Sequence, residues 1–226
     1  MNMPKPKAVI FDLDDTLIER RAMMEVFAPL FLHRYFPHAA GAEYDRIYET
    51  FLRMDDGGNT ARPGLFHLFH DALGITERPS DRELLDFWNE HFADHTVPVP
   101  GAEDCLHALK ADGCLLGMIT NGNPVLQNHK IDHTGFRGLF DNILVSGTFG
   151  CDKPDPRIFR ASLDALGITA DEAIYIGDNL TNDIYGAHGA GMQAVWANYS
   201  GRVNTTEFRP DYEIHAVLEL LTLNLD

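Results

Sequence analysis

The chain has 226 residues, enough for one large domain or for one domain that carries an insertion. Its 34 acidic and 18 basic residues give a net charge of −16, while hydrophobic residues make up an ordinary 45%. This acidic balance argues against a nucleic-acid polymer or a membrane as partner, because clustered lysine and arginine bind both. An anionic ligand would therefore have to be attracted by a local positive site or by a metal ion.

The first predicted element is a strand, Ala8–Phe11, which runs directly into the sequence Asp-Leu-Asp-Asp-Thr at positions 12–16. Residues two apart at a strand end point to the same side, so we expect Asp12 and Asp14 side by side. Two such carboxylates repel each other unless a cation lies between them or one is protonated. Either arrangement suits nucleophilic or acid–base catalysis. Taken alone, an Asp-x-Asp segment is more often a turn or a helix cap.

The next segment, residues 18–97, has apolar residues at helical spacing. One stripe consists of Tyr44, Ile47, Tyr48 and Phe51. Such stripes predict a bundle of about four helices inserted after the first strand. The predicted domains are a core of residues 1–17 and 98–226 and a helical insertion of residues 18–97. Within the insertion, Arg62 lies in a Pro-Gly loop and is a candidate for contacting a distal anion of a ligand, although solvated surface is the simpler interpretation.

Beyond residue 101, helical and strand patterns alternate. The predicted strands are 115–119, 142–146, 173–177 and 194–197, and amphipathic helices are predicted near 102–109 and 159–166. Helices that alternate with short apolar strands imply a parallel sheet covered on both faces. The predicted fold class is therefore α/β.

Polar residues follow three of these strands. Thr120 and Asn121 end the first in a tight turn, where a hydroxyl and backbone N–H groups can hold phosphate oxygens. Lys153 supplies a point charge for the same oxygens. Asp178 and Asp183 offer hard oxygen ligands that suit magnesium. Singly, each is better explained as a turn, a loop lysine or a helix cap, but the carboxyl ends of parallel strands converge on one site.

The motifs in chain order resemble the haloacid dehalogenase superfamily, in its phosphatase branch with a helical cap. They are Asp12-x-Asp14-x-Thr16, Thr120, Lys153, and Gly177-Asp178 with Asp183. The opening motif is similar to those of pyrimidine nucleotidase and N-acylneuraminate-9-phosphatase-like members. The resemblance implies a Rossmann-like three-layer core, with the first strand between the strands ending at Thr120 and Gly177, and an all-helical cap.

The resemblance also implies a catalytic role for both early aspartates. Asp12 would be the nucleophile and a metal ligand. Asp14 would be the general acid/base, with its backbone carbonyl on the metal. Asp178 would complete the ligands of a Mg²⁺ cofactor. Because dehalogenases of this superfamily do not keep Asp14 as acid/base, its presence here argues against halide displacement.

For the remaining positions the resemblance implies binding roles. Thr120, Lys153 and the backbone N–H of Asn121 would hold the transferring phosphoryl group. Asp183 would order either Lys153 or a metal-bound water. The expected partner is a small phosphorylated metabolite.

The sequence-based hypothesis is a magnesium-dependent phosphatase that acts through an aspartyl-phosphate on a small soluble phosphomonoester, with a nucleoside monophosphate or a sugar phosphate as the guess. A phosphomutase of the same superfamily and a non-catalytic binding protein are the alternatives. We expect a monomer or homodimer. Three cysteines without metal-ligand spacing, and a start at residues 1–5 without a signal-peptide pattern, predict a reduced cytoplasmic setting.

Overall fold

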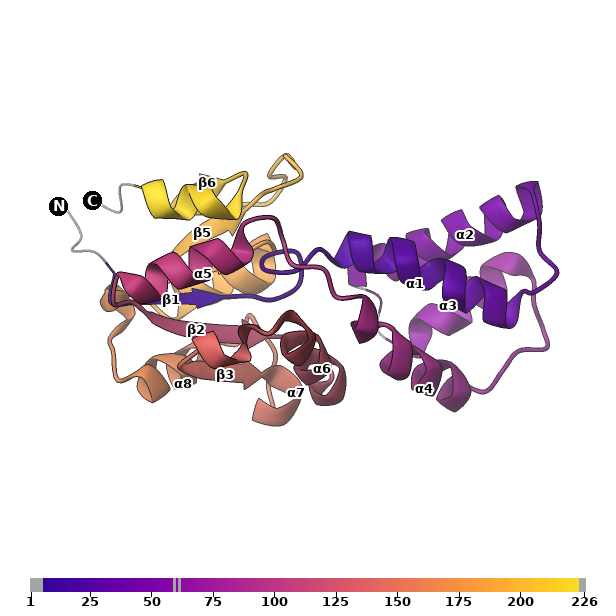
Figure 1. Ribbon diagram of the computed structural model, residues 1–226, viewed down its shortest axis with the longest axis horizontal. Helices are drawn as coiled ribbons and strands as arrows, with labels where there is room; N and C mark the ends of the chain where they lie inside the picture. Colours follow the sequence, from indigo (N-terminus) through magenta and orange to yellow (C-terminus); the bar gives the residue numbers. More distant parts are fainter. Residues whose placement is uncertain (1–5, 59, 61, 224–226) are drawn as a thin grey trace. The chain divides into compact units, whose positions relative to one another are not determined.

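The computed structural model describes residues 6–58, 60 and 62–223. The chain forms two compact units, which we call the core unit (Met1–Glu19 with Pro98–Asp226) and the helical unit (Arg20–Val97) (Figure 1). The prediction of localisation rests on residues 1–5, which lie outside the described residues. No helix in the described part of the chain combines the length and the apolar character needed to cross a membrane.

A six-stranded sheet forms the centre of the core unit. Its strands are β1 (Ala8–Phe11), β2 (Leu115–Thr120), β3 (Asn142–Val145), β4 (Ala173–Gly177), β5 (Gln193–Ala197) and β6 (Tyr212–Ile214). Their order is β3-β2-β1-β4-β5-β6, and every neighbouring pair is parallel. The predicted α/β class is thus confirmed, together with the place of β1 between β2 and β4.

Helices cover both faces of this sheet. They are α5 (Ala102–Ala111), α6 (Pro124–Thr134), α7 (Ser146–Phe149), α8 (Pro156–Leu166) and α9 (Gly186–Gly189). On one face, Phe159 of α8 packs with Ile10 and Tyr175 of the strands in a buried apolar cluster. On the other face, α5 lies beside the 3₁₀ helix Val217–Thr222 (Figure 1). The core unit therefore has the three layers of a Rossmann-like fold.

Strand β6 and helix α6 are among the elements of the core unit that were not predicted. Strand β6 has three residues, one of them the exposed Glu213, too short for a strand pattern. Helix α6 begins at Asn123, whose side chain accepts hydrogen bonds from the backbone N–H groups of Val125 and Leu126. Its buried face contains the polar residues Gln127 and Lys130, so its apolar residues form no helical stripe.

The inserted segment is all helical in its described part. Its α-helices are α1 (Arg20–Tyr35), α2 (Ala42–Asp55), α3 (Gly64–Leu73) and α4 (Asp81–His91). Aromatic rings fill the space between them. Phe31 stacks on Phe51 with ring centroids 4.6 Å apart, and Trp88 lies at the same distance from Phe27. This unit thus has a hydrophobic core of its own.

Candidate active site

Strand β1 delivers Asp12 to the carboxyl edge of the sheet, where its backbone N–H continues the ladder by donating to Ile176 O at 2.8 Å. The Asp12 side chain is buried, and its Oδ1 accepts a hydrogen bond from Lys153 Nζ at 2.6 Å. Lys153 is also buried, and its Nζ donates to Asp183 Oδ1 at 2.7 Å and to the Tyr175 hydroxyl at 3.0 Å. One ammonium group therefore joins residues that follow β1 and β4.

Three of the predicted carboxylates form a cluster. Asp12, Asp178 and Asp183 each contribute one oxygen, and these oxygens lie within 4.8 Å of one another. The close approach of Asp183 requires a glycine at position 177, because a Cβ there would lie 2.3 Å from Asp183 Cγ. Asp183 Oδ2 also accepts the backbone N–H of Asn179 at 2.9 Å, which fixes its side chain against the end of β4.

The electrostatics of this cluster favour a cation. Burial raises the pKa of Asp12 well above its usual range, and the charges of Asp183 and Asp178 add to this against the opposing charge of Lys153. Burial likewise raises the pKa of Asp178 to about 7, with Asp183 and Asp15 contributing. Burial alone would lower the pKa of Lys153, but Asp12 and Asp183 raise it well above its ordinary value, so this lysine stays charged.

The donor set fits a hard divalent cation. Three carboxylates lie together here, two of them paired with Lys153 and the third, that of Asp178, with the exposed Arg202. Carboxylate oxygens are the ligands that Mg²⁺ takes, together with water. A bound cation would offset the repulsion that raises the pKa values of Asp12 and Asp178. The residues present are therefore compatible with the predicted magnesium cofactor.

Asp14 lies in a different environment from Asp12. Its Oδ1 and Oδ2 accept hydrogen bonds from Lys130 Nζ at 2.7 and 2.9 Å, and Oδ2 accepts a further one from Gln127 Nε2 at 2.9 Å. We expected a shared cation or a proton to relieve the repulsion between Asp12 and Asp14. In the structure each carboxylate also contacts a lysine of its own, because α6 supplies a buried cation that the sequence pattern did not reveal.

The predicted phosphate-binding residues lie next to these carboxylates. Thr120, the last residue of β2, is buried, and its Oγ1 accepts a hydrogen bond from Gln127 Nε2 at 2.6 Å. The side chain of Asn121 exchanges two hydrogen bonds with the backbone of Lys153, at 3.0 and 2.8 Å. The end of β2 and the loop that carries Lys153 are thereby held together.

Sequence reasoning missed four residues of this region. Gln127 and Lys130 are three positions apart, which places them on one face of a helix, but their burial cannot be read from the sequence, so no local pattern marked them. Tyr175 was indistinguishable from a core aromatic residue. Arg202, an exposed residue, donates to the Asp178 backbone oxygen and to its Oδ2, both at 2.9 Å, and no motif marks it.

The helical unit contains the predicted specificity residue, Arg62. Its Nη2 donates to Asp55 Oδ1 at 2.7 Å, and its guanidinium lies 4.0 Å from the centroid of the Trp88 ring. Arg20 donates to both oxygens of the same carboxylate, at 2.8 and 3.0 Å. Arg62 is thus part of a mostly buried ion-pair cluster and is not the solvated surface residue that was the simpler expectation.

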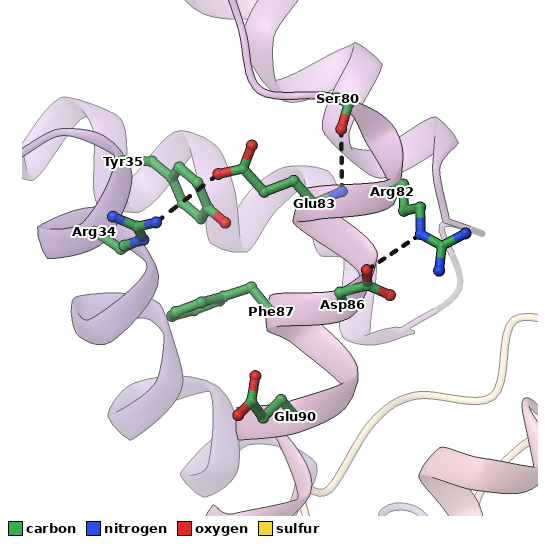
Figure 2. A pocket seen from close by; sticks show the side chains of 8 residues that line it. All are labelled: Arg34, Tyr35, Ser80, Arg82, Glu83, Asp86, Phe87 and Glu90. Carbon is green, nitrogen blue, oxygen red and sulfur yellow. Dashed lines mark hydrogen bonds and ion pairs between the residues drawn. The ribbon is translucent and has the colours of Figure 1, made fainter.

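A hollow on the helical unit is open and has mixed charge. Figure 2 shows Arg34 facing Glu83 at 4.0 Å and Arg82 facing Asp86 at 3.5 Å, while the Ser80 hydroxyl caps α4. These ion pairs are exposed and of the kind that contributes little binding energy. The charged groups pair with each other and do not converge on a common point, so this hollow lacks the features of the carboxylate site.

The sequence matches the profile of the haloacid dehalogenase-like hydrolase family over residues 6–191. It is 30% identical over 220 residues to a glyceraldehyde 3-phosphate phosphatase of Pyrococcus furiosus, covering 96% of this chain and 91% of the relative. It is 30% identical over 237 residues to an N-acylneuraminate-9-phosphatase of Mus musculus, covering 99% and 95%.

The fold is similar to a solved structure of the same superfamily. This is the HAD-hydrolase YfnB from Bacillus subtilis bound to magnesium, with a TM-score of 0.78 and 25% sequence identity. The match covers 97% of this chain and 98% of that one. Both units of the present chain therefore have counterparts in the YfnB structure.

Proposed function

The chain belongs to the haloacid dehalogenase-like hydrolase family, and from this membership we propose that it is a magnesium-dependent phosphatase of small phosphomonoesters. The observation that carries the proposal is the buried contact between Lys153 Nζ and Asp12 Oδ1, at 2.6 Å, beside the carboxylates of Asp178 and Asp183. This contact supports the proposal because the proposed nucleophile, a buried positive charge and the proposed metal ligands lie together at the edge of the sheet.

In the proposed reaction, Asp12 Oδ attacks phosphorus while the bond from phosphorus to the leaving oxygen breaks. The leaving oxygen keeps the electron pair and takes a proton from Asp14. The product of this half-reaction is a phosphorylated Asp12. Water then attacks phosphorus, Asp14 takes a proton from that water, and the bond from phosphorus to Asp12 breaks. Asp12 is thereby regenerated, and inorganic phosphate leaves.

The other side chains would hold the transferring group. Lys153 would lie against the phosphoryl oxygens and reduce their repulsion with the Asp12 carboxylate. Thr120 and the backbone N–H of Asn121 would donate to the same oxygens. Asp12, Asp178 and the backbone carbonyl of Asp14 would hold Mg²⁺, which supplies Lewis-acid stabilisation of the phosphoryl group. Asp183 would keep Lys153 oriented.

The proposed substrates are phosphorylated sugars and related hydroxy compounds. The relatives reported above are named for glyceraldehyde 3-phosphate and for N-acylneuraminate 9-phosphate, and both names describe a phosphate ester of a carbohydrate-like alcohol. Arg62 stays a proposal for contacting a distal anion of the substrate. Its contact with Asp55 leaves the cluster of Arg20, Asp55 and Arg62 with a net positive charge.

The test is release of phosphate from a panel of sugar phosphates, nucleoside monophosphates and p-nitrophenyl phosphate, with Mg²⁺ and with EDTA. We expect release that requires Mg²⁺ and is abolished in Asp12→Asn. Acid quenching with ³²P-labelled substrate should trap label on the wild-type protein and none on that variant. If the folded wild-type protein releases no phosphate from any ester, the proposal is wrong, and conversion between sugar-phosphate isomers becomes the assay for the phosphomutase alternative.

A further inference from the structure

Helix α6 contributes two buried polar side chains to the site. The proposed mechanism gives neither of them a role. Lys130 and Gln127 are 1% and 2% exposed. Both reach Asp14, a residue more than a hundred positions earlier in the chain. Burying an ammonium group is unfavourable unless a partner compensates it, so the contact with Asp14 explains how Lys130 can be buried here.

The hydrogen bonds fix both oxygens of the Asp14 carboxylate. Lys130 Nζ lies 2.7 Å from Oδ1 and 2.9 Å from Oδ2, and Gln127 Nε2 lies 2.9 Å from Oδ2. The donors come from one helix, three positions apart, and helices hold side chains more precisely than loops do. Asp14 itself lies in the turn after β1, so α6 fixes its side chain from a different element of the fold.

Gln127 connects Asp14 to the proposed phosphate pocket. The same Nε2 atom that contacts Asp14 also donates to Thr120 Oγ1 at 2.6 Å. One amide group therefore lies between the proposed general acid/base and a proposed ligand of the phosphoryl group. The distance between these two groups decides whether the acid lies within hydrogen-bond reach of the leaving oxygen.

We propose that Lys130 and Gln127 are positioning residues, which hold the Asp14 side chain at a fixed place relative to Thr120, so that its protonated form lies within reach of the leaving oxygen. This inference rests on the proposed phosphatase function and extends it. In this proposal neither residue contacts the substrate. Because they act through Asp14, their effect on kcat/KM should be larger for substrates whose leaving group must be protonated as it departs.

The experiment compares kcat/KM for an alkyl phosphate and for p-nitrophenyl phosphate. This constant covers the steps up to departure of the leaving group, and p-nitrophenolate departs with little help from an acid. We expect Lys130→Met to lower kcat/KM for the alkyl ester by about 10²-fold, the lower range of general-acid effects, and by less than about 10-fold for the aryl ester. Gln127→Leu should act in the same direction, and Lys130→Arg should restore most of the loss.

A double-mutant cycle separates positioning from structural damage. If Lys130 acts through Asp14, Lys130→Met should cost almost nothing further in an Asp14→Asn background. Lys110→Met is the matched control, since Lys110 Nζ contacts both oxygens of Asp141 at 3.0 and 2.8 Å elsewhere in the core unit. Lys110→Met should leave the ratio of kcat/KM for the alkyl ester to kcat/KM for the aryl ester unchanged.

The outcomes distinguish this inference from the proposed function. Equal losses for both esters, or losses that add to those of Asp14→Asn, would overturn the positioning role and leave the phosphatase proposal intact. Wild-type kcat/KM in Lys130→Met would do the same. Absence of phosphate release by the wild-type protein would instead contradict the proposed function itself.

Discussion

Asp183 Oδ1 lies 2.7 Å from Lys153 Nζ, although thirty positions separate the two residues in the chain. The Asp183 side chain is 1% exposed and also accepts the backbone N–H of Asn179. The Lys153 ammonium group is therefore held between Asp183 and Asp12. Its position is set by a residue that, in the proposed mechanism, never touches substrate.

Asp183→Asn tests this relationship. The amide keeps the shape of the side chain but removes the charge that holds Lys153, so the ammonium group should move toward Asp12. We expect kcat/KM to fall by about 10²-fold, the cost of a misplacement of about 1 Å. Steady-state kinetics check this, with Asp132→Asn as a control at an exposed carboxylate that pairs with Arg137. Activity equal to wild type would show that the contacts with Asp12 and Tyr175 orient Lys153 without Asp183.

Asp178→Asn should stabilise the protein relative to wild type without magnesium and destabilise it relative to wild type with magnesium. The pKa of Asp178 is raised from 3.8 to about 7 in the folded chain, mainly by burial. Between these values the folded state holds a proton on Asp178 that the unfolded state has lost, so the contribution of this group to the stability of the metal-free protein falls as the pH rises from 3.8 to about 7. Above about pH 7 the neutral amide should therefore be more stable than the ionised carboxylate in EDTA.

In saturating Mg²⁺ the order should invert, because only the wild-type carboxylate binds the cation well. Binding at about 100 times the dissociation constant adds about 2.7 kcal/mol to the wild-type protein. Thermal unfolding in both conditions gives the two comparisons. The fluorescence of Trp196, whose Nε1 donates to the Asp178 backbone oxygen at 2.9 Å, reports binding independently of activity. A variant that gains as much from Mg²⁺ as wild type would exclude Asp178 as a ligand.

Gly177→Ala should damage the site without altering any charged group. The new Cβ would lie 2.3 Å from Asp183 Cγ, so the Asp183 side chain must leave its contact with Lys153. We expect a loss of about 1–3 kcal/mol of unfolding free energy, as in other overpacked sites, together with a large loss of activity. Gly138→Ala is the control, since a Cβ there meets no atom within 4 Å. Unfolding in urea and kinetics of both variants measure the difference.

His70 should make the stability of the helical unit depend on pH. Its side chain is buried, its Nδ1 faces the Phe66 carbonyl at 2.7 Å, and burial lowers its pKa below 6.5. As the pH falls through about 6.5, the unfolded chain takes up a proton that the folded chain does not, so the stability present at higher pH declines. His70→Gln should flatten this dependence.

Trp88 gives a probe confined to the helical unit, because the chain has two tryptophans and Trp196→Phe removes the other. Urea unfolding, followed by Trp88 fluorescence from about pH 5 to about pH 8, gives the slope of the unfolding free energy against pH. His33→Gln, at an exposed position on α1, controls for the loss of a histidine. The same slope in His70→Gln and in wild type would assign the pH dependence to other groups.

Much of the core unit could be predicted because its central strands are continuous apolar runs that end in polar residues. Ala8–Phe11 is fully buried on both faces, so its pattern and the position of Asp12 follow from four residues. The convergence of Asp12, Asp178 and Asp183 follows in turn from parallel strands, whose carboxyl ends meet at one edge.

The partners of Asp14 could not be predicted, because a buried ion pair between distant elements leaves no local pattern. Lys130 is separated from Asp14 by 116 positions. Its buried ammonium group weakens the apolar stripe of α6, the signal by which that helix would have been recognised. The environment of Arg62 could not be predicted for a similar reason. Its place in a Pro-Gly loop does not indicate that its guanidinium group donates to Asp55 and lies over the Trp88 ring.

The central place of β1 also has a consequence for synthesis. Ala8 pairs with Leu115 on one side and with Ala173 on the other, so β1 leaves the ribosome before both of the strands that cover its edges. At typical translation speeds it waits on the order of 10 s, while the helical unit, which has a hydrophobic core of its own, is synthesised in between. Strand β1 has only four residues, which is shorter than the segments that nucleate aggregates. Its brevity protects the nascent chain during that wait.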